Sequence, residues 1–255
     1  MLIYKLVLRA RPAPVAVFLK KLLRVNRHVL KVDNGEFYID PISKFGMILM
    51  RDGEYEPHMT QTLKNILKPS CVFVDIGANE GYFSVLAGRI VGSTGRIIAV
   101  EPQARAALIL AENIRLNALS NVTVVPTAVS DRIGEAALHL SPDTNTGSTS
   151  LIQTTRYRLP REVVQTATLS ELFEQYSIEV ADLVKMDIEG FEYEAIFGSP
   201  NIFREQRVRY LALELHPPLL KRKGLEANAI LKFLAECGYV ADTRFRNLVL
   251  LAGTI

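Results

Sequence analysis

Charged side chains stand in pairs, two residues apart, after two apolar runs in the second half of the sequence. One pair is Asp187 and Glu189, preceded by Lys185, and the other is Glu214 and His216. Side chains two residues apart in a strand point to the same side of a sheet. Carboxylates and imidazoles are common acceptors of a hydroxyl proton. The two pairs therefore predict a catalytic site, with Lys185 as a further catalytic group or as a charge partner of the acids.

Each pair also has an interpretation that involves no chemistry. Asp187 could cap the helix that follows, and Glu189 could lie in its first turn, where the helix dipole favours an acid. His216 precedes two prolines and could be an exposed turn residue. An oxygen-rich set of this kind can also hold Mg²⁺. The ion stays an open alternative, and the sequence designates no residue as a metal ligand.

A second candidate site is the stretch VDIGANEGYF at residues 74 to 83. It follows an apolar run typical of a strand buried on both faces of a parallel sheet. Gly77 and Gly81 can let the backbone turn tightly and approach a ligand. The dinucleotide fingerprint needs a glycine where Asn79 stands, and no G-x-x-x-x-G-K-[ST] motif occurs, which argues against NAD and excludes a P-loop.

Two later strand ends extend this second site. Glu101 ends the next predicted strand, and an acid there can accept both hydroxyls of a ribose. Ser130 and Asp131 follow the third strand and suit the edge of an adenine. Asp75 would repel a pyrophosphate, but it suits the positive end of S-adenosylmethionine. Together these residues predict an adenosine-type pocket for that cofactor.

The two sites need a sheet whose strands end at one edge. Five apolar runs alternate with helical patterns: CVFVDIG, GRIIAVEP, NVTVVPTAVSD, ADLVKMDIEG and VRYLALELHPP. This alternation predicts a doubly wound, mainly parallel α/β sheet, and YVADTRFRNLVLLAG predicts a closing antiparallel hairpin. Open sheets of this kind bind ligands at the carboxyl ends of their strands. We therefore expect both sites to share one cleft.

The first part of the chain differs in charge from the rest. Residues 1 to 32 hold eight Lys or Arg and no acid, which leaves 22 basic and 27 acidic residues in the remainder. Apolar and basic positions alternate from 14 to 31 and predict an amphipathic helix. Residues 1–31 could contact an anionic membrane surface or complete a dimer, but packing on the body is favoured because large exposed apolar patches are uncommon. A basic arm on an acidic body does not predict nucleic-acid binding.

Two further features set the context of the chain. No apolar run reaches the ~18 residues of a membrane span, and Cys71 and Cys237 match no metal or redox spacing, so we expect a cytoplasmic protein. In DGEYEP, Glu54 and Glu56 are typical of a solvated turn, and Tyr55 could cover the cofactor. The polar stretch PDTNTGSTS could be a lid or a plain surface loop.

Five separated motifs resemble one known family. VFVDIGANEGYFS, GRIIAVEP, NVTVVPTAVSD, LVKMDIEGFE and LALELH stand in the order and spacing of the FkbM family of S-adenosylmethionine-dependent methyltransferases, over residues 37 to 237. The resemblance implies the seven-stranded class I (Rossmann-like) methyltransferase fold at 69–255, after a basic helical and strand extension and cap at 1–68. The cofactor positions that the resemblance implies are Asp75, Gly77, Asn79, Gly81, Glu101 and Asp131. Ala78 and Ser130, which stand beside them in the same motifs, are predicted as cofactor positions too.

The family resemblance also implies a reaction. It is methyl transfer to a hydroxyl of a small-molecule or glycan acceptor, such as a sugar, glycolipid or natural product. An N- or C-methyltransferase on the same fold is an alternative, because a fold does not set the acceptor. A catalytically silent cofactor-binding adaptor is another, although such a protein has no need for Asp187, Glu189 and His216 together at strand ends.

Overall fold

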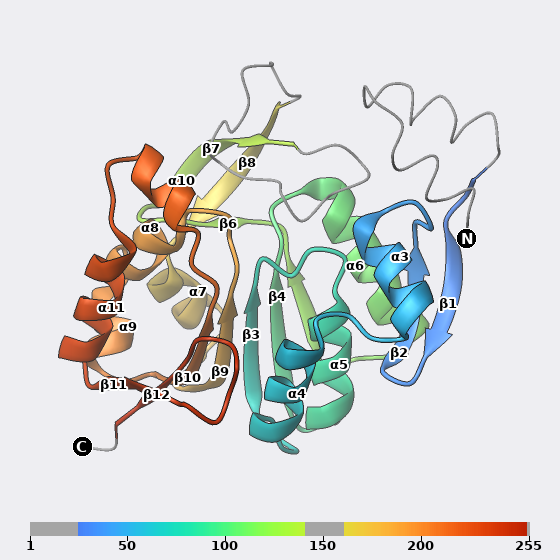
Figure 1. The fold of residues 1–255 in the computed structure, drawn as a ribbon, viewed down its shortest axis with the longest axis horizontal. Coiled ribbons are helices and arrows are strands. Elements are labelled where there is room, and N and C mark those ends of the chain that lie inside the picture. Colours follow the sequence, from blue (N-terminus) through green and yellow to red (C-terminus); the bar gives the residue numbers. More distant parts are fainter. Residues whose placement is uncertain (1–24, 141–160, 254–255) are drawn as a thin grey trace.

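A seven-stranded sheet forms the centre of the molecule (Figure 1). The computed structural model describes residues 25–140 and 161–253, and the sheet has the strand order β11-β12-β10-β9-β3-β4-β5. β12 runs in the direction opposite to the other six strands, which are parallel to one another. This confirms the predicted fold class, including the closing hairpin. The strands are β3 (Val72–Ile76), β4 (Arg96–Val100), β5 (Val122–Val125), β9 (Ala181–Met186), β10 (Val208–Leu213), β11 (Tyr239–Ala241) and β12 (Val249–Ala252).

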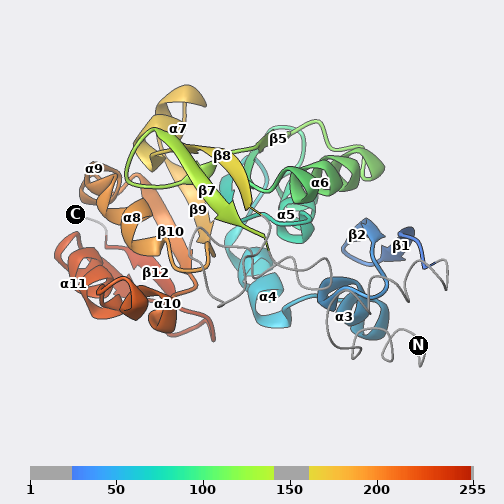
Figure 2. The ribbon, with the colours of Figure 1, turned by 90° about the horizontal axis from the view of Figure 1, so that it is seen from above.

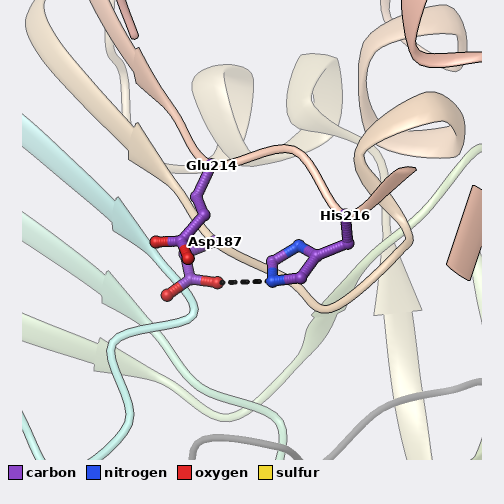
Figure 3. Close-up of side chains that lie close together, drawn as sticks. All are labelled: Asp187, Glu214 and His216. Carbon is purple, nitrogen blue, oxygen red and sulfur yellow. Dashed lines mark ion pairs between the residues drawn. The ribbon is translucent and has the colours of Figure 1, made fainter. Parts of the chain in front are cut away.

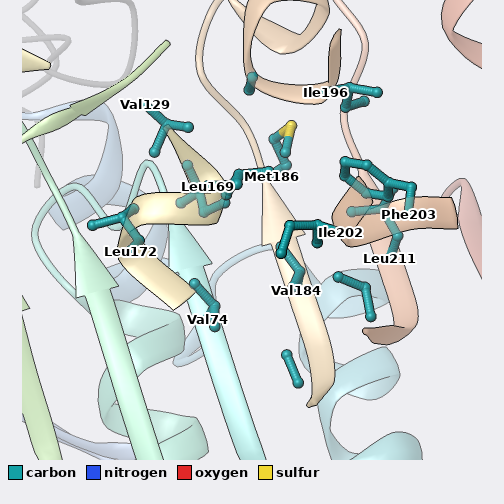
Figure 4. Packing of buried hydrophobic residues seen from close by; sticks show 14 of the residues in the cluster. Val74, Val129, Leu169, Leu172, Val184, Met186, Ile196, Ile202, Phe203 and Leu211 are labelled. Carbon is teal, nitrogen blue, oxygen red and sulfur yellow. The ribbon is translucent and has the colours of Figure 1, made fainter. Parts of the chain in front are cut away.

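Helices cover both faces of this sheet because the strand side chains alternate between two apolar layers. Val74 and Ile76 belong to a cluster that Figure 4 shows with Leu172 and Phe203, and Phe73 belongs to the opposite cluster. The first layer is completed by α7 (Leu169–Gln175), α8 (Glu192–Phe197), α9 (Pro200–Arg204) and α11 (Ala227–Glu236). The second face carries α4 (Pro57–Ile66), α5 (Tyr82–Val91) and α6 (Ala104–Leu116), while α10 (Pro217–Arg222) follows β10.

A small second sheet is inserted after β5. Its order is β6-β8-β7, with β6 at Ala128–Val129, β7 at Gly134–His139 and β8 at Arg161–Ala167. Figure 2 shows β7 and β8 side by side above the main sheet. The polar stretch predicted as a lid or surface loop lies between these strands and outside the described residues.

The N-terminal part of the described chain is a hairpin followed by two helices. The hairpin consists of β1 (His28–Val32) and β2 (Gly35–Ile39), and α3 (Lys44–Asp52) precedes α4. The predicted helix at 14–31 falls mostly outside the described residues, and its end is wrong because 28–31 form a strand. The reason is the turn at Asp33 and Asn34, whose residue types favour a tight hairpin between the alternating segments HVLKV and GEFYI.

Polar contacts and a shared core attach this hairpin to the main sheet. Arg27 donates to both carboxylate oxygens of Glu80, at 2.6 and 3.0 Å. Asn113 on α6 accepts from the Tyr38 backbone and donates to the Glu80 carbonyl oxygen, at 2.6 and 2.7 Å. Phe37 and its neighbours lie in one apolar cluster with β3 and α5. Within the described residues, no helix is both long and apolar enough to cross a membrane.

We expect Arg27→Ala to lower the free energy of unfolding by about 2–3 kcal/mol, because it leaves a buried carboxylate without its partner. The side chain of Glu80 is 3% exposed and that of Arg27 is 15% exposed. The matched control is Lys31→Ala, which removes an exposed pair with Glu36 and should cost less than about 1 kcal/mol. Urea unfolding measures both. Equal losses would show that the buried pair contributes no more than a surface pair.

Candidate active site

The ends of three neighbouring strands meet at one cleft, as the sequence predicts for an open sheet. The hydrogen-bond ladder continues past the strands, because the Asp187 amide donates to the Ile76 carbonyl at 3.0 Å and the Glu214 amide to the Met186 carbonyl at 2.9 Å. Asp187 is therefore held next to the end of β3, and Glu214 is held beside Asp187 (Figure 3). Main-chain and side-chain atoms of these and other strand ends line the cleft, among them Gly77, Ala78, Asn79, Gly81, Glu101, Lys185, Asp187, Glu189 and Glu214.

The glycine loop after β3 has left-handed backbone at Gly77, Asn79 and Gly81, with φ of 83°, 50° and 88°. A Cβ atom at Gly77 would overlap the carbonyl oxygen of Asp187, and one at Gly81 would overlap the side chain of Leu110. The predicted reasons for these glycines were a tight turn and close approach to a ligand. The left-handed backbone confirms the turn, and both positions are in addition pressed against neighbouring chain.

Glu101 is buried at the end of β4, and its carboxylate is held by the backbone. The amide of Asn79 donates to Oε2 at 2.8 Å and that of Gln103 donates to Oε1 at 2.9 Å. Burial raises the pKa of Glu101 to about 7, although the two amides lower it. Each oxygen can still accept a further hydrogen bond. The Oδ1 atom of Asn79 is buried without a hydrogen-bond partner among the described residues, in the wall of the same cleft.

Three predicted cofactor residues do not line the cleft. Asp75 is fully buried below it, where Oδ2 accepts from the Ser84 hydroxyl at 2.6 Å. Its partner across the sheet is Lys185, as the register of β3 and β9 requires. Ser130 donates to Asp131 at 3.2 Å, and neither side chain faces the cleft. The wall at this point consists of Thr127, Ala128, Val129 and Leu138.

The other end of the cleft gathers the residues predicted as catalytic. The Lys185 ammonium is buried 3.6 Å from Asp187 and 3.8 Å from Asp75. His216 stands just outside the cleft lining, with Nε2 3.8 Å from Asp187 and 3.6 Å from Glu189. All five predicted catalytic residues are therefore neighbours, with Glu214 beside Asp187.

The simpler interpretations of these residues do not fit the geometry. Helix α8 begins after Phe191 without a side-chain cap, so Asp187 does not cap it, and the acids in its first turn are Glu192 and Glu194 rather than Glu189. His216 precedes α10, and its side chain is only 18% exposed because it packs against the acids. The backbone at Glu189 is left-handed, with φ of 50°. Such strain at a non-glycine residue is typical of functional sites.

Electrostatics couple the charged groups at this end. Burial opposes the charge of His216, but a hydrogen bond with Glu192 and the nearby carboxylates raise its pKa to about 9. Burial and the neighbouring acids raise the pKa of Glu189 to about 7, with His216 opposing them. Burial likewise opposes the charge of Lys185, yet Asp187 and Asp75 raise its pKa. His216 is thus a cation near neutral pH, so it must lose a proton before it can accept one.

The sequence reasoning missed most of a second wall of the cleft. Lys44 and Glu56, between β2 and α4, line the cleft opposite the strand ends, together with Tyr55, which the sequence suggested as a cover for the cofactor. Glu56 is not a solvated turn residue: its backbone is left-handed with φ of 44°, and burial raises the pKa of its carboxyl. The aromatic ring of Tyr55 packs against Phe45 and Tyr82. The charge of Lys185 across the cleft, not any local pattern, explains why an acid is tolerated there.

Comparisons with known proteins place the chain in a family. The model of the methyltransferase FkbM domain matches residues 75–241. No curated protein sequence matches the chain. Among solved structures, a putative rRNA-methylase from Clostridium thermocellum is similar with 10% identity and a TM-score of 0.50, over 78% of this chain and 95% of that chain. At that identity the likeness shows the fold alone.

Two further solved structures are more distant in shape. A SAM-dependent O-methyltransferase from Thermotoga maritima has 14% identity and a TM-score of 0.44, over 87% of this chain and 67% of that chain. Fibrillarin from Aeropyrum pernix, solved with natively bound S-adenosyl-L-methionine, has 15% identity and a TM-score of 0.42, over 76% and 73%.

We expect Gly77→Ala to destabilise the protein far more than Gly53→Ala. Both positions have left-handed backbone, with φ of 83° and 71°, but a Cβ at Gly53 meets nothing within 4 Å. The backbone cost alone is about 1–2 kcal/mol, and the overlap with Asp187 should add about 1–3 kcal/mol at Gly77. Thermal unfolding of both variants measures the difference. Similar midpoints would show that the Gly77–Asp187 contact relaxes without cost.

Proposed function

The chain belongs to the FkbM family of methyltransferases, and from that membership we propose that its acceptor is a hydroxyl of a sugar, glycolipid or natural product. It is a methyltransferase whose cofactor is S-adenosylmethionine. The observation that supports oxygen as the acceptor atom is the group of carboxylates Asp187, Glu189 and Glu214 at one end of the cleft. A hydroxyl is a poor nucleophile until its proton has an acceptor.

The other end of the cleft fits the cofactor. Glu101 offers two carboxylate oxygens to the ribose hydroxyls, and the unpartnered Oδ1 of Asn79 can accept from a donor of the ligand. Ala128, Val129 and Leu138 offer apolar surface for the adenine. When bound, S-adenosylmethionine supplies a methyl group that its positive sulfur has already activated. The loop at Gly77–Gly81 would then lie between the ribose subsite and the carboxylates.

The residues of the chain would position the acceptor and take its proton. Methyl transfer is an in-line displacement, so much of the catalysis is orientation. Asp187 and Glu189 can accept a hydrogen bond from the attacking hydroxyl and remove its proton. Lys185, buried below Asp187, stabilises that carboxylate as an anion. Tyr55 and Glu56 close the side opposite the strand ends, which restricts how an acceptor enters.

We expect the affinity for S-adenosylhomocysteine to rise with pH up to about 7 and to be level above it. The pKa of Glu101 in the free protein is about 7. Ribose hydroxyls would donate to the ionised carboxylate and so lower its pKa, which means that binding below pH 7 releases a proton. Affinity should then fall up to about tenfold for each pH unit below 7. Calorimetry in buffers of different ionisation enthalpy detects the released proton.

Two variants separate Glu101 from other titrating groups. Glu101→Ala should weaken binding by at least ~1.5 kcal/mol, because charge-assisted hydrogen bonds are lost. Glu101→Gln keeps the shape but cannot titrate, so the pH step should vanish. An unchanged pH step in Glu101→Gln would assign it to another group, and unchanged affinity in Glu101→Ala would refute the ribose assignment.

Asp187→Asn should reduce turnover roughly 100-fold or more, the usual effect of removing a positioned base. His216→Ala should reduce it comparably, because the imidazole no longer holds Asp187 and Glu189 in position. The affinity for S-adenosylhomocysteine should stay within about twofold, because both residues lie away from the ribose subsite. Glu236→Gln, which removes an exposed acid on α11, is the control. Turnover is followed as transfer of isotope-labelled methyl from S-adenosylmethionine into a cell extract.

Mass analysis of the labelled product tests the acceptor class. A methyl ether on a sugar, glycolipid or natural product supports the proposal. Label found on nitrogen or carbon would support the N- or C-methyltransferase alternative. Binding of the cofactor without any labelled product from extract would favour a silent cofactor-binding protein.

A further inference from the structure

We infer that Asp187, Glu214 and His216 form a binding site for a divalent metal ion at the edge of the cleft. One ligand atom from each residue lies within 4.8 Å of the other two, and Figure 3 shows the three side chains pointing toward one another. The inference deepens the proposed function and rests on it in one respect, which is that the ion would bind the acceptor hydroxyl. The presence of the ion itself can be measured without any acceptor.

The strand ladder holds the backbone of two of these ligands in place. The Asp187 and Glu214 amides donate to the adjacent strands, so their side chains leave neighbouring strand ends. An ion bound at about 2.1 Å by ligands at right angles places their atoms about 3 Å apart. The three groups must therefore close by about 1–2 Å, and the long, exposed side chain of Glu214 can move by rotation of its own bonds.

Glu192 orients the imidazole toward the site. It is fully buried, and its Oε1 atom lies 2.8 Å from Nδ1 of His216. With Nδ1 donating to that carboxylate, Nε2 is the nitrogen that faces Asp187. An ion bound there would displace the proton that Nε2 carries while His216 is a cation. A carboxylate behind the histidine is the usual way in which proteins orient a metal ligand and increase its basicity. The same carboxylate oxygen also accepts from the Gly190 amide at 3.0 Å, which fixes Glu192.

One buried oxygen atom on the far side of Lys185 lacks a hydrogen bond within the described part of the chain. Oδ1 of Asp75 is fully buried and has no hydrogen bond from any described residue. It points toward Lys185, whose ammonium lies between Asp75 and Asp187 at 3.8 and 3.6 Å, too far to hydrogen-bond either. A cation on Asp187 would repel Lys185 toward Asp75. The unpartnered oxygen would then gain its hydrogen bond.

The ligand types indicate which ion to test. Carboxylates suit Mg²⁺ and Mn²⁺, whereas an imidazole suits transition metals, so a set of two carboxylates and one imidazole fits Mn²⁺ better than Mg²⁺. An ion there would bind the acceptor oxygen and lower the pKa of its hydroxyl. As the carbon–sulfur bond breaks and the carbon–oxygen bond forms, the hydroxyl proton would pass to Glu189, the remaining carboxylate of this group.

Electron paramagnetic resonance of free Mn²⁺, titrated with full-length chelator-treated protein, tests the site. We expect one Mn²⁺ per chain at micromolar affinity, with Mg²⁺ competing weakly. Asp187→Asn should weaken Mn²⁺ binding at least tenfold. Glu192→Gln, which preserves the side-chain shape, should weaken it about 10–100-fold. Glu236→Gln should bind as the wild type does.

Either of two results would overturn the inference. The wild-type protein could bind no Mn²⁺, or the Asp187→Asn and Glu192→Gln variants could bind Mn²⁺ as tightly as the wild type does. The readouts also distinguish this inference from the proposed function. Methyl transfer at full rate after chelation would refute the part of the ion in the reaction and leave the proposed function intact. Tight Mn²⁺ binding without methyl transfer to any hydroxyl would support the metal site and refute the proposed hydroxyl acceptor.

Discussion

The close packing of Gly77 against the carbonyl oxygen of Asp187 sets the geometry of the cleft. The loop after β3 and the backbone just past the end of β9 approach each other closely there. Any side chain at residue 77 would separate the two strand ends, and Asp187 would move away from the glycine loop. The same parallel register places Asp75 directly opposite Lys185. One pairing of strands thus fixes the glycine loop, the buried Lys185 and the carboxylate of Asp187 together.

The charge arrangement follows from that pairing. Asp75, Lys185 and Asp187 form a row that runs from the fully buried interior to the half-buried cleft. A lysine so deeply buried keeps its charge because acids stand on both sides of it. His216 repeats the arrangement after β10, with buried Glu192 behind it and Asp187 before it. The site is therefore a set of alternating charges whose inner members hold the outer ones in position.

Much of this could be predicted from the sequence because the sheet follows a regular rule. Alternating apolar runs and helical patterns predict a doubly wound parallel sheet, and the strand ends then locate Glu101, Asp187 and Glu214. What could not be predicted depends on contacts between distant segments. Nothing local to DGEYEP indicates that Glu56 faces Lys185, and nothing in AVSD indicates that Ser130 and Asp131 lie outside the lining of the cleft. Strand β1 was mistaken for the end of a helix because its apolar and basic residues also fit a helical spacing.

The pair of Arg27 and Glu80 joins the N-terminal hairpin to the loop after β3, and only the loop lies within the match to the family model. The match to the family model covers residues 75–241, so it includes the acid of this pair and leaves out the guanidinium that neutralises it. An acid at position 80 is costly to bury alone, and a homologue without the hairpin should carry a neutral residue there. Covariation between the two positions would then record which members of the family share this N-terminal hairpin, even where the hairpin sequence itself has diverged beyond alignment.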